Sequence, residues 1–170
     1  MAVAYQPRTE VYRFRPVVVF LAVFAAILLQ ASLPLYLNFL SLFDLPLLVV
    51  IYFGFSRRNP STGLLLGLAV GVAQDALSAN PIGLFGMAKT LVGYGASSLS
   101  ARIDTDQPQA RLLLLFLFYH FHQFIAAAIQ RWLLGQAADF FSLPVLEAAL
   151  VNALLGVLVF HLLDRFRKTT

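Results

Sequence analysis

Six apolar runs, separated by short polar segments, dominate the pattern of this chain. A helix of about 20 residues crosses the roughly 30 Å hydrocarbon core of a bilayer, so runs of this kind predict membrane-spanning helices. The predicted spans are residues 16–33, 42–55, 62–77, 83–101, 112–134 and 145–163. The pattern therefore predicts an all-α fold, a polytopic membrane bundle of six helices, with residues 1–170 forming a single integral membrane domain.

The second predicted span is the shortest. Its helix, residues 42–55, reaches only about 21 Å at 1.5 Å per residue. Polar and helix-breaking residues interrupt the apolar stretch around its start, among them Asn38, Asp44 and Pro46. We expect the connection 35–43 to lie in the outer interface or to dip into the membrane. Broken backbone is tolerated at that depth only where protein or water covers it.

Composition supports a membrane protein. Hydrophobic residues make up 60% of the chain and charged residues only 12%, whereas soluble domains are about 25% charged. The absence of cysteine excludes disulfides, thiolate metal sites and cysteine nucleophiles. Residues 1–15 are polar and basic, but the apolar run that follows is long for a signal peptide, so we interpret it as a retained first span.

The basic residues orient the bundle. Of the twelve Lys and Arg residues, ten fall before the first span, after the second, after the fourth and after the sixth. These residues are Arg8, Arg13, Arg15, Arg57, Arg58, Arg102, Arg111, Arg165, Arg167 and Lys168. With six spans all ten share one side, and the positive-inside rule then places both termini in the cytoplasm. The net charge of +4 thus indicates topology and not nucleic-acid binding.

The third span carries a stripe of small residues. Gly63, Gly67 and Gly71 recur every four residues and so share one helix face. In water each glycine would cost about 1 kcal/mol relative to alanine, but in lipid it lets another backbone approach closely. The fourth span has a similar stripe that includes Gly86 and Gly93. We predict that these glycines pack helices together, and the pattern leaves open whether one stripe faces another protein.

A polar motif ends the third span. Gln74 and Asp75 precede a turn signal, Asn80-Pro81-Ile-Gly83, and Lys89 follows inside the fourth span. A carboxylate in such a helix needs a partner or a wet cavity. We predict an ion pair of Asp75 with Lys89 that locks this hairpin near the outer face. The alternatives are a polar pocket that opens outward or a contact for a partner. Asp75→Ala should then reduce the amount of folded protein.

Catalytic signals are missing from the sequence. His120 and His122 are two residues apart and point to different faces of one helix, which suits interhelical hydrogen bonds better than a shared metal. The chain has no GxxxxGK phosphate loop, no HExxH motif and no nucleophile–base set. We therefore predict no enzyme activity, no cofactor and no metal.

Residues 44–95 resemble the MreD family of bacterial rod-shape-determining proteins. The matching features are PLLVVIY at 46–52, the glycines at 63, 67 and 71, Gln74-Asp75, Asn80-Pro81-Ile-Gly83, and Gly93-Tyr94. Chain length and the number of spans extend the resemblance to the whole chain. It implies a non-enzymatic scaffold subunit of the cell-elongation complex, which builds peptidoglycan, in the bacterial cytoplasmic (inner) membrane.

The resemblance also implies partners. MreC is the first, and MreB, RodA and its penicillin-binding transpeptidase are further ones. The basic tails, Arg8 to Arg15 and Arg165 to Lys168, would meet MreB or anionic lipid, and the lipid reading is favoured. The family is similar in architecture to the S components of energy-coupling-factor transporters. The alternative function is therefore a substrate-binding subunit for uptake of a small vitamin-like ligand.

Overall fold

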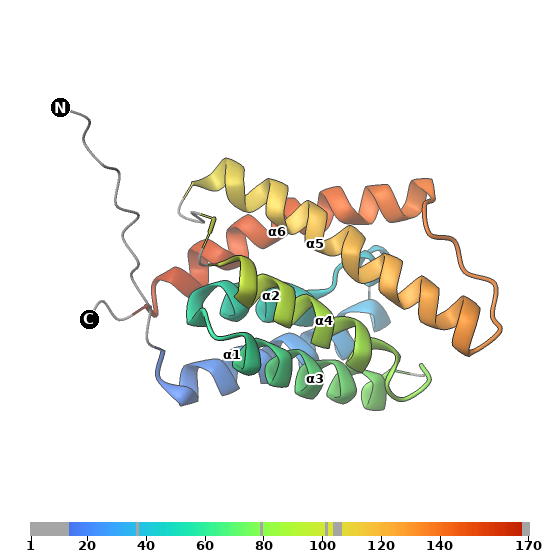
Figure 1. Cartoon of the computed structure of the whole chain (residues 1–170), viewed down its shortest axis with the longest axis horizontal. Coiled ribbons are helices and arrows are strands. Elements are labelled where there is room, and N and C mark those ends of the chain that lie inside the picture. Colours follow the sequence, from blue (N-terminus) through green and yellow to red (C-terminus); the bar gives the residue numbers. More distant parts are fainter. Residues whose placement is uncertain (1–13, 37, 79, 101, 104–106, 168–170) are drawn as a thin grey trace.

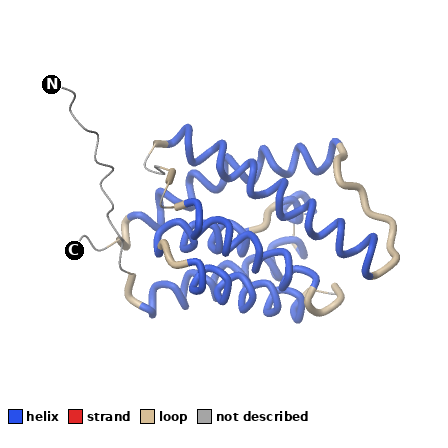
Figure 2. Tube along the Cα trace, viewed as in Figure 1, coloured by secondary structure: helices blue, strands red, loops and turns tan. Residues whose placement is uncertain are grey.

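Every regular element that the structure describes is helical. The computed structural model describes residues 14–36, 38–78, 80–100, 102–103 and 107–167, and this part of the chain contains no strand (Figures 1 and 2). The α-helices are α1 Pro16–Ser32, α2 Leu45–Arg57, α3 Pro60–Leu77, α4 Leu84–Leu99, α5 Pro108–Ala128 and α6 Leu143–Asp164. Short helical turns are η1 Leu33–Leu35, η2 Asn38–Leu42 and η3 Ile129–Leu133. The prediction of an all-α bundle is confirmed.

Six helices stand where six spans were predicted, with bounds that differ by a few residues. Within the described residues, four segments are long and apolar enough to cross a membrane: Pro16–Leu35, Phe39–Arg57, Pro108–Leu133 and Leu143–Asp164. Helix α4 has only 16 residues, and α3 combines 18 residues with three glycines and a polar end. That α3 and α4 also cross the membrane, and with it the six-span topology, stays a prediction.

The helices run back and forth along the long axis of the molecule (Figure 1). The start of α1, the α2–α3 connection, the α4–α5 connection and the end of α6 gather at one end of the bundle. The η1–η2 segment, the α3–α4 turn and the α5–α6 connection gather at the opposite end, which we call the turn end. This arrangement matches the alternation from which the basic residues were assigned to one side.

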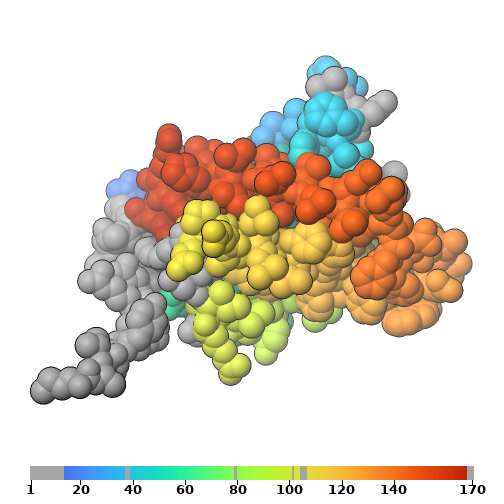
Figure 3. All heavy atoms as spheres, turned by 90° about the horizontal axis from the view of Figure 1, so that it is seen from above, coloured from blue at the N-terminus to red at the C-terminus, as the bar shows by residue number. Residues whose placement is uncertain are grey.

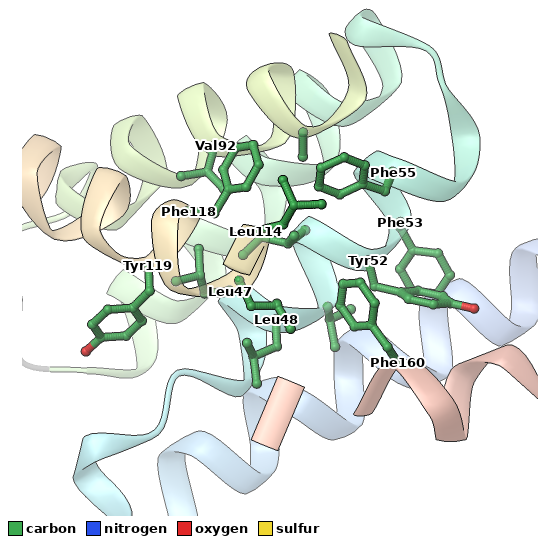
Figure 4. Packing of buried hydrophobic residues seen from close by; sticks show 14 of the residues in the cluster. Leu47, Leu48, Tyr52, Phe53, Phe55, Val92, Leu114, Phe118, Tyr119 and Phe160 are labelled. Atoms are coloured by element: carbon green, nitrogen blue, oxygen red, sulfur yellow. The ribbon is translucent and has the colours of Figure 1, made fainter. Parts of the chain in front are cut away.

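Helix α2 forms the centre of the bundle. Its residues Pro46–Ser56 are all buried, and it contacts α1, α3, α4, α5 and α6. Figure 4 shows its side chains Leu48 and Tyr52 packed toward Phe160 of α6, while Phe55 meets Phe118 of α5. A helix that is apolar on all sides requires such complete burial or lipid around it.

The outer surface of the bundle is apolar as well. Helix α6, on the face that Figure 3 presents, exposes a stripe of leucines. These are Leu143, Leu146, Leu150, Leu154, Leu158 and Leu162. The η1–η2 segment projects beside this face at the turn end (Figure 3). Lipid is the solvent that makes so much exposed Leu and Phe favourable.

Candidate functional site

The glycine stripes of α3 and α4 face each other. A Cβ added at Gly67 would overlap the carbonyl group of Lys89, and one added at Gly71 would overlap the backbone of Phe85. Gly63 lies against Gly93 in the same way. The two backbones therefore approach to a distance that only glycine permits. Both stripes face each other inside the α3–α4 hairpin, so these glycines are not exposed for contact with another protein.

The Asp75 carboxylate caps α4. It accepts hydrogen bonds from the backbone N–H groups of Gly83 (2.9 Å), Phe85 (3.1 Å) and Gly86 (3.0 Å). The first N–H groups of a helix lack partners within the helix, and the helix dipole favours an anion there. Gly83, which follows Pro81 in the turn, has a φ of 99° that favours glycine. The motif from Asp75 to Gly83 is thus a hairpin whose first helix caps the second.

Lys89 does not take Asp75 as its salt-bridge partner. Its Nζ lies 2.6 Å from Oδ2 of Asp44 and 3.3 Å from Nε2 of His122. The prediction of an Asp75–Lys89 ion pair was wrong, because the backbone N–H groups of α4 already occupy the Asp75 carboxylate while Lys89 lies a turn further along that helix. Lys89 is fully buried and lies beside the Phe85 ring, 5.0 Å from its centroid.

Asp44 sits at a break in the chain between η2 and α2. Its backbone N–H donates to Oδ1 of Asn152 (2.8 Å), and the N–H of Leu45 donates to Oε1 of Gln30 (3.1 Å). Asn152 also donates to the carbonyl of Leu42 (2.7 Å). Backbone groups without helical partners are costly inside a membrane, and these side chains supply the missing hydrogen bonds. The break is where the sequence predicted interrupted backbone.

A cavity of about 290 Å³ adjoins this network at the turn end. Its lining comes from α1, η1, η2, α3, α4 and α5 and includes Asp44, Gln74, Phe85, Tyr119 and His122. In two of the lining residues one buried atom, Oε1 of Gln74 and Nδ1 of His122, is closed off from solvent and has no hydrogen-bond partner. The alternative prediction placed a polar pocket at Asp75 and Lys89; this cavity is lined by the neighbouring Gln74 and by Asp44, and by neither of those two residues.

A second polar cluster lies at the opposite end of the bundle. Asp164 forms salt bridges with Arg111 (2.7 Å) and Arg167 (2.7 Å) and accepts a hydrogen bond from the Tyr52 hydroxyl (2.9 Å). Arg167, predicted to be part of a basic tail, is therefore held against the bundle. Arg15 and Arg165 are exposed residues at this end. Arg8, Arg13 and Lys168 lie outside the described residues.

The side chains of this network hold one another in position by hydrogen bonds, and its charged members, Asp44 and Lys89, form an ion pair. Within the described ranges, no three His, Cys, Asp or Glu side chains come together as a metal site. His120 bonds back to its own helix at the carbonyl of Phe116 (3.0 Å), whereas His122 points inward. The site can form hydrogen bonds through a neutral imidazole, amides and a phenol, which lie next to one buried ion pair.

Sequence reasoning missed three members of the site: Asp44 as the partner of Lys89, and Asn152 and Gln30 as backbone partners. Each had a signal. Asn152 is the lone amide of the sixth span, and Gln30 is the lone amide of the first span. A polar side chain in a membrane helix needs a partner of its own, and broken backbone ahead of α2 needed donors and acceptors of this kind.

Nearly the whole chain matches one family of known proteins. A scan against protein-family models matches residues 12–167 to the family described as rod shape-determining protein MreD. The chain belongs to the MreD family. No curated protein matched the chain, and no solved structure matched it. Membership in the MreD family, a family of shape-determining proteins, supports a role in rod-shape determination, and together with the apolar helices it indicates a membrane protein.

Proposed function

We propose that this chain is a non-enzymatic scaffold of the bacterial cell-elongation complex and that it binds MreC within the inner membrane. The family match over residues 12–167 carries the proposal. Both termini lie in the cytoplasm in this proposal, because the described basic helix ends gather at one end of the bundle. The function is assembly by helix packing, without turnover.

A groove between α1 and α3 is the surface we assign to the MreC helix. It has a volume of about 510 Å³, and apart from Arg57 its lining is apolar and includes Phe20 and Phe24 of α1 and Ala69 and Ala73 of α3. Small residues four apart let a second helix approach closely. Helix α1 is also poorly covered, because Phe20 and Phe24 each leave at least half of their surface exposed.

Cysteine cross-linking tests the groove. The chain has no cysteine, so Ala69→Cys and the control Leu154→Cys each carry a single thiol for a maleimide–benzophenone probe. Leu154 is exposed on α6. We expect an adduct with co-expressed MreC from Ala69→Cys and none from Leu154→Cys. Equal adducts at both positions would refute the groove, and failure of MreC to co-purify with the unmodified chain would refute the partnership itself.

The further partners, MreB, RodA and its penicillin-binding transpeptidase, belong to the same proposal and rest on the family alone. The second candidate function, an S-component-like subunit for uptake of a small vitamin-like ligand, is favoured by one observation, the cavity at the turn end. Tight retention of such a ligand by protein that does not bind MreC would support this second candidate over the scaffold.

A further inference from the structure

The groove between α1 and α3 is lined by one charged side chain among the described residues. Arg57, at the end of α2, is half-buried and lines the groove together with apolar residues of the two helices. Within the described part of the chain, Arg57 forms no salt bridge, and its guanidinium makes no hydrogen bond. A cation held against an apolar wall without a counter-ion is costly. The groove therefore favours an anion that comes from outside the chain.

Two more arginines lie at the same end of the bundle. Arg15 is exposed and directly precedes Pro16, which lines the groove, and Arg58 directly follows Arg57. The start of α1 and the α2–α3 connection gather at this end (Figure 1). Arg58 has a φ of 51°, a left-handed conformation that usually holds glycine after a helix. Residues kept in such a conformation cluster at functional sites, so the retention of an arginine here fits a role for its charge.

The apolar part of the groove is about as long as one leaflet is deep. Its lining on α1 runs from Pro16 to Ile27, which is about 16 Å at 1.5 Å per residue. This length is about half of the roughly 30 Å hydrocarbon core of a bilayer. Phe20 and Phe24 border the groove and are exposed, so the groove opens toward the bilayer. Lipid hydrocarbon therefore fills it whenever no partner helix covers it.

We propose that an anionic phospholipid occupies the α1–α3 groove when MreC does not. Its phosphate pairs with Arg57, and one acyl chain lies along α1 and α3. Guanidinium and phosphate form strong, bidentate hydrogen bonds, and anionic headgroups attract basic clusters at the membrane surface. Arg57 belongs to neither basic tail, so this is a separate lipid contact. The exclusion of the lipid by MreC rests on the proposed function, whereas the lipid site itself does not.

Native mass spectrometry of the purified full-length protein, without MreC, tests the lipid site. The probes are phosphatidylglycerol and phosphatidylcholine with identical acyl chains, and glycerol 3-phosphate, which is anionic but has no chain. We expect one phosphatidylglycerol per protein chain, bound about fivefold more tightly than phosphatidylcholine and not displaced by glycerol 3-phosphate. Equal binding of the two lipids, or displacement by glycerol 3-phosphate, would overturn the proposal.

Two matched pairs of variants locate the lipid. Arg57→Gln removes the cation from the groove, and the control Arg102→Gln removes an exposed cation from the α4–α5 connection, outside the lining. Ala69→Phe fills the groove, and the control Leu154→Phe changes an exposed position on α6. We expect Arg57→Gln and Ala69→Phe to bind phosphatidylglycerol at least about fivefold more weakly and both controls to bind it normally. Equal binding by Arg57→Gln and Arg102→Gln would overturn the assignment.

Two further measurements separate this proposal from folding and from the proposed function. Arg57→Lys keeps the charge at the end of α2 and should recover most of the phosphatidylglycerol binding that Arg57→Gln loses; binding as weak as that of Arg57→Gln would count against a headgroup contact. The complex with MreC should carry no lipid that depends on Arg57, and a complex that retains this lipid would refute the exclusion. Failure of MreC to co-purify would refute the proposed function and leave the lipid site standing.

Discussion

Replacing Lys89 with Met removes the ammonium group from the buried network and keeps an unbranched side chain. Asp44 then loses the partner that lies 2.6 Å away. At an effective dielectric constant of about 20, the attraction at this separation is roughly 6 kcal/mol. The loss has a lower ceiling, because protonating a carboxyl group with an ordinary pKa of about 3.9 at pH 7 costs about 4 kcal/mol. We therefore expect Lys89→Met to lower the free energy of unfolding by about 3–4 kcal/mol.

The double variant makes this prediction specific to the pair. Asp44→Asn keeps an oxygen that can accept from the Leu47 N–H but leaves the Lys89 ammonium unpaired. The combination Asp44→Asn/Lys89→Met leaves no buried charge at this site, so we expect it to be at least about 2 kcal/mol more stable than Lys89→Met alone. The measurement is SDS-induced unfolding followed by circular dichroism. Additive losses in the double variant, or single losses below about 1 kcal/mol, would refute the reasoning.

Two further predictions concern the α3–α4 hairpin. Asp75→Ala removes the acceptor of three backbone N–H groups and should lower the free energy of unfolding by about 3 kcal/mol. Asp75→Asn should lose less, because it keeps one oxygen. Equal stability of wild type and Asp75→Ala in the same assay would contradict the capping role. Gly67→Ala places a methyl group on the Lys89 carbonyl and should cost about 2 kcal/mol, whereas Leu68→Ala, at an exposed position, should cost less than about 1 kcal/mol. A larger loss in Leu68→Ala than in Gly67→Ala would argue against close backbone packing.

Much of the fold was predictable because each helix is encoded locally. Apolar runs long enough for a membrane, ended by Pro, Gly or charged residues, placed all six helices. The basic residues also predicted which connections lie at the same end of the bundle, since Arg57 and Arg58 mark one connection and Arg102 another. The glycines predicted tight packing, and the structure shows which helix each stripe meets.

The partners inside the site were harder to predict, because they depend on how each helix is rotated about its axis. Asp75 and Lys89 are close in the sequence and opposite in charge, which favoured pairing them. The geometry of the turn instead aims Asp75 at the backbone of α4, and Lys89 meets a residue 45 positions earlier in the chain. No pattern within one helix specifies such a contact, and the same holds for Asn152, which is 108 residues from Asp44.

The separation of Asp44 and Asn152 along the sequence sets an order of events during synthesis. The hydrogen bonds that cover the break before α2 come in part from α6, which is made 108 residues later. At about 5–20 residues per second, the ribosome needs roughly 5–20 s to supply that partner. During this interval the break has neither Asn152 nor, at first, Lys89. The break before the second span therefore leaves the ribosome with backbone groups that still lack their partners, and it gains the last of them only once α6 has been made.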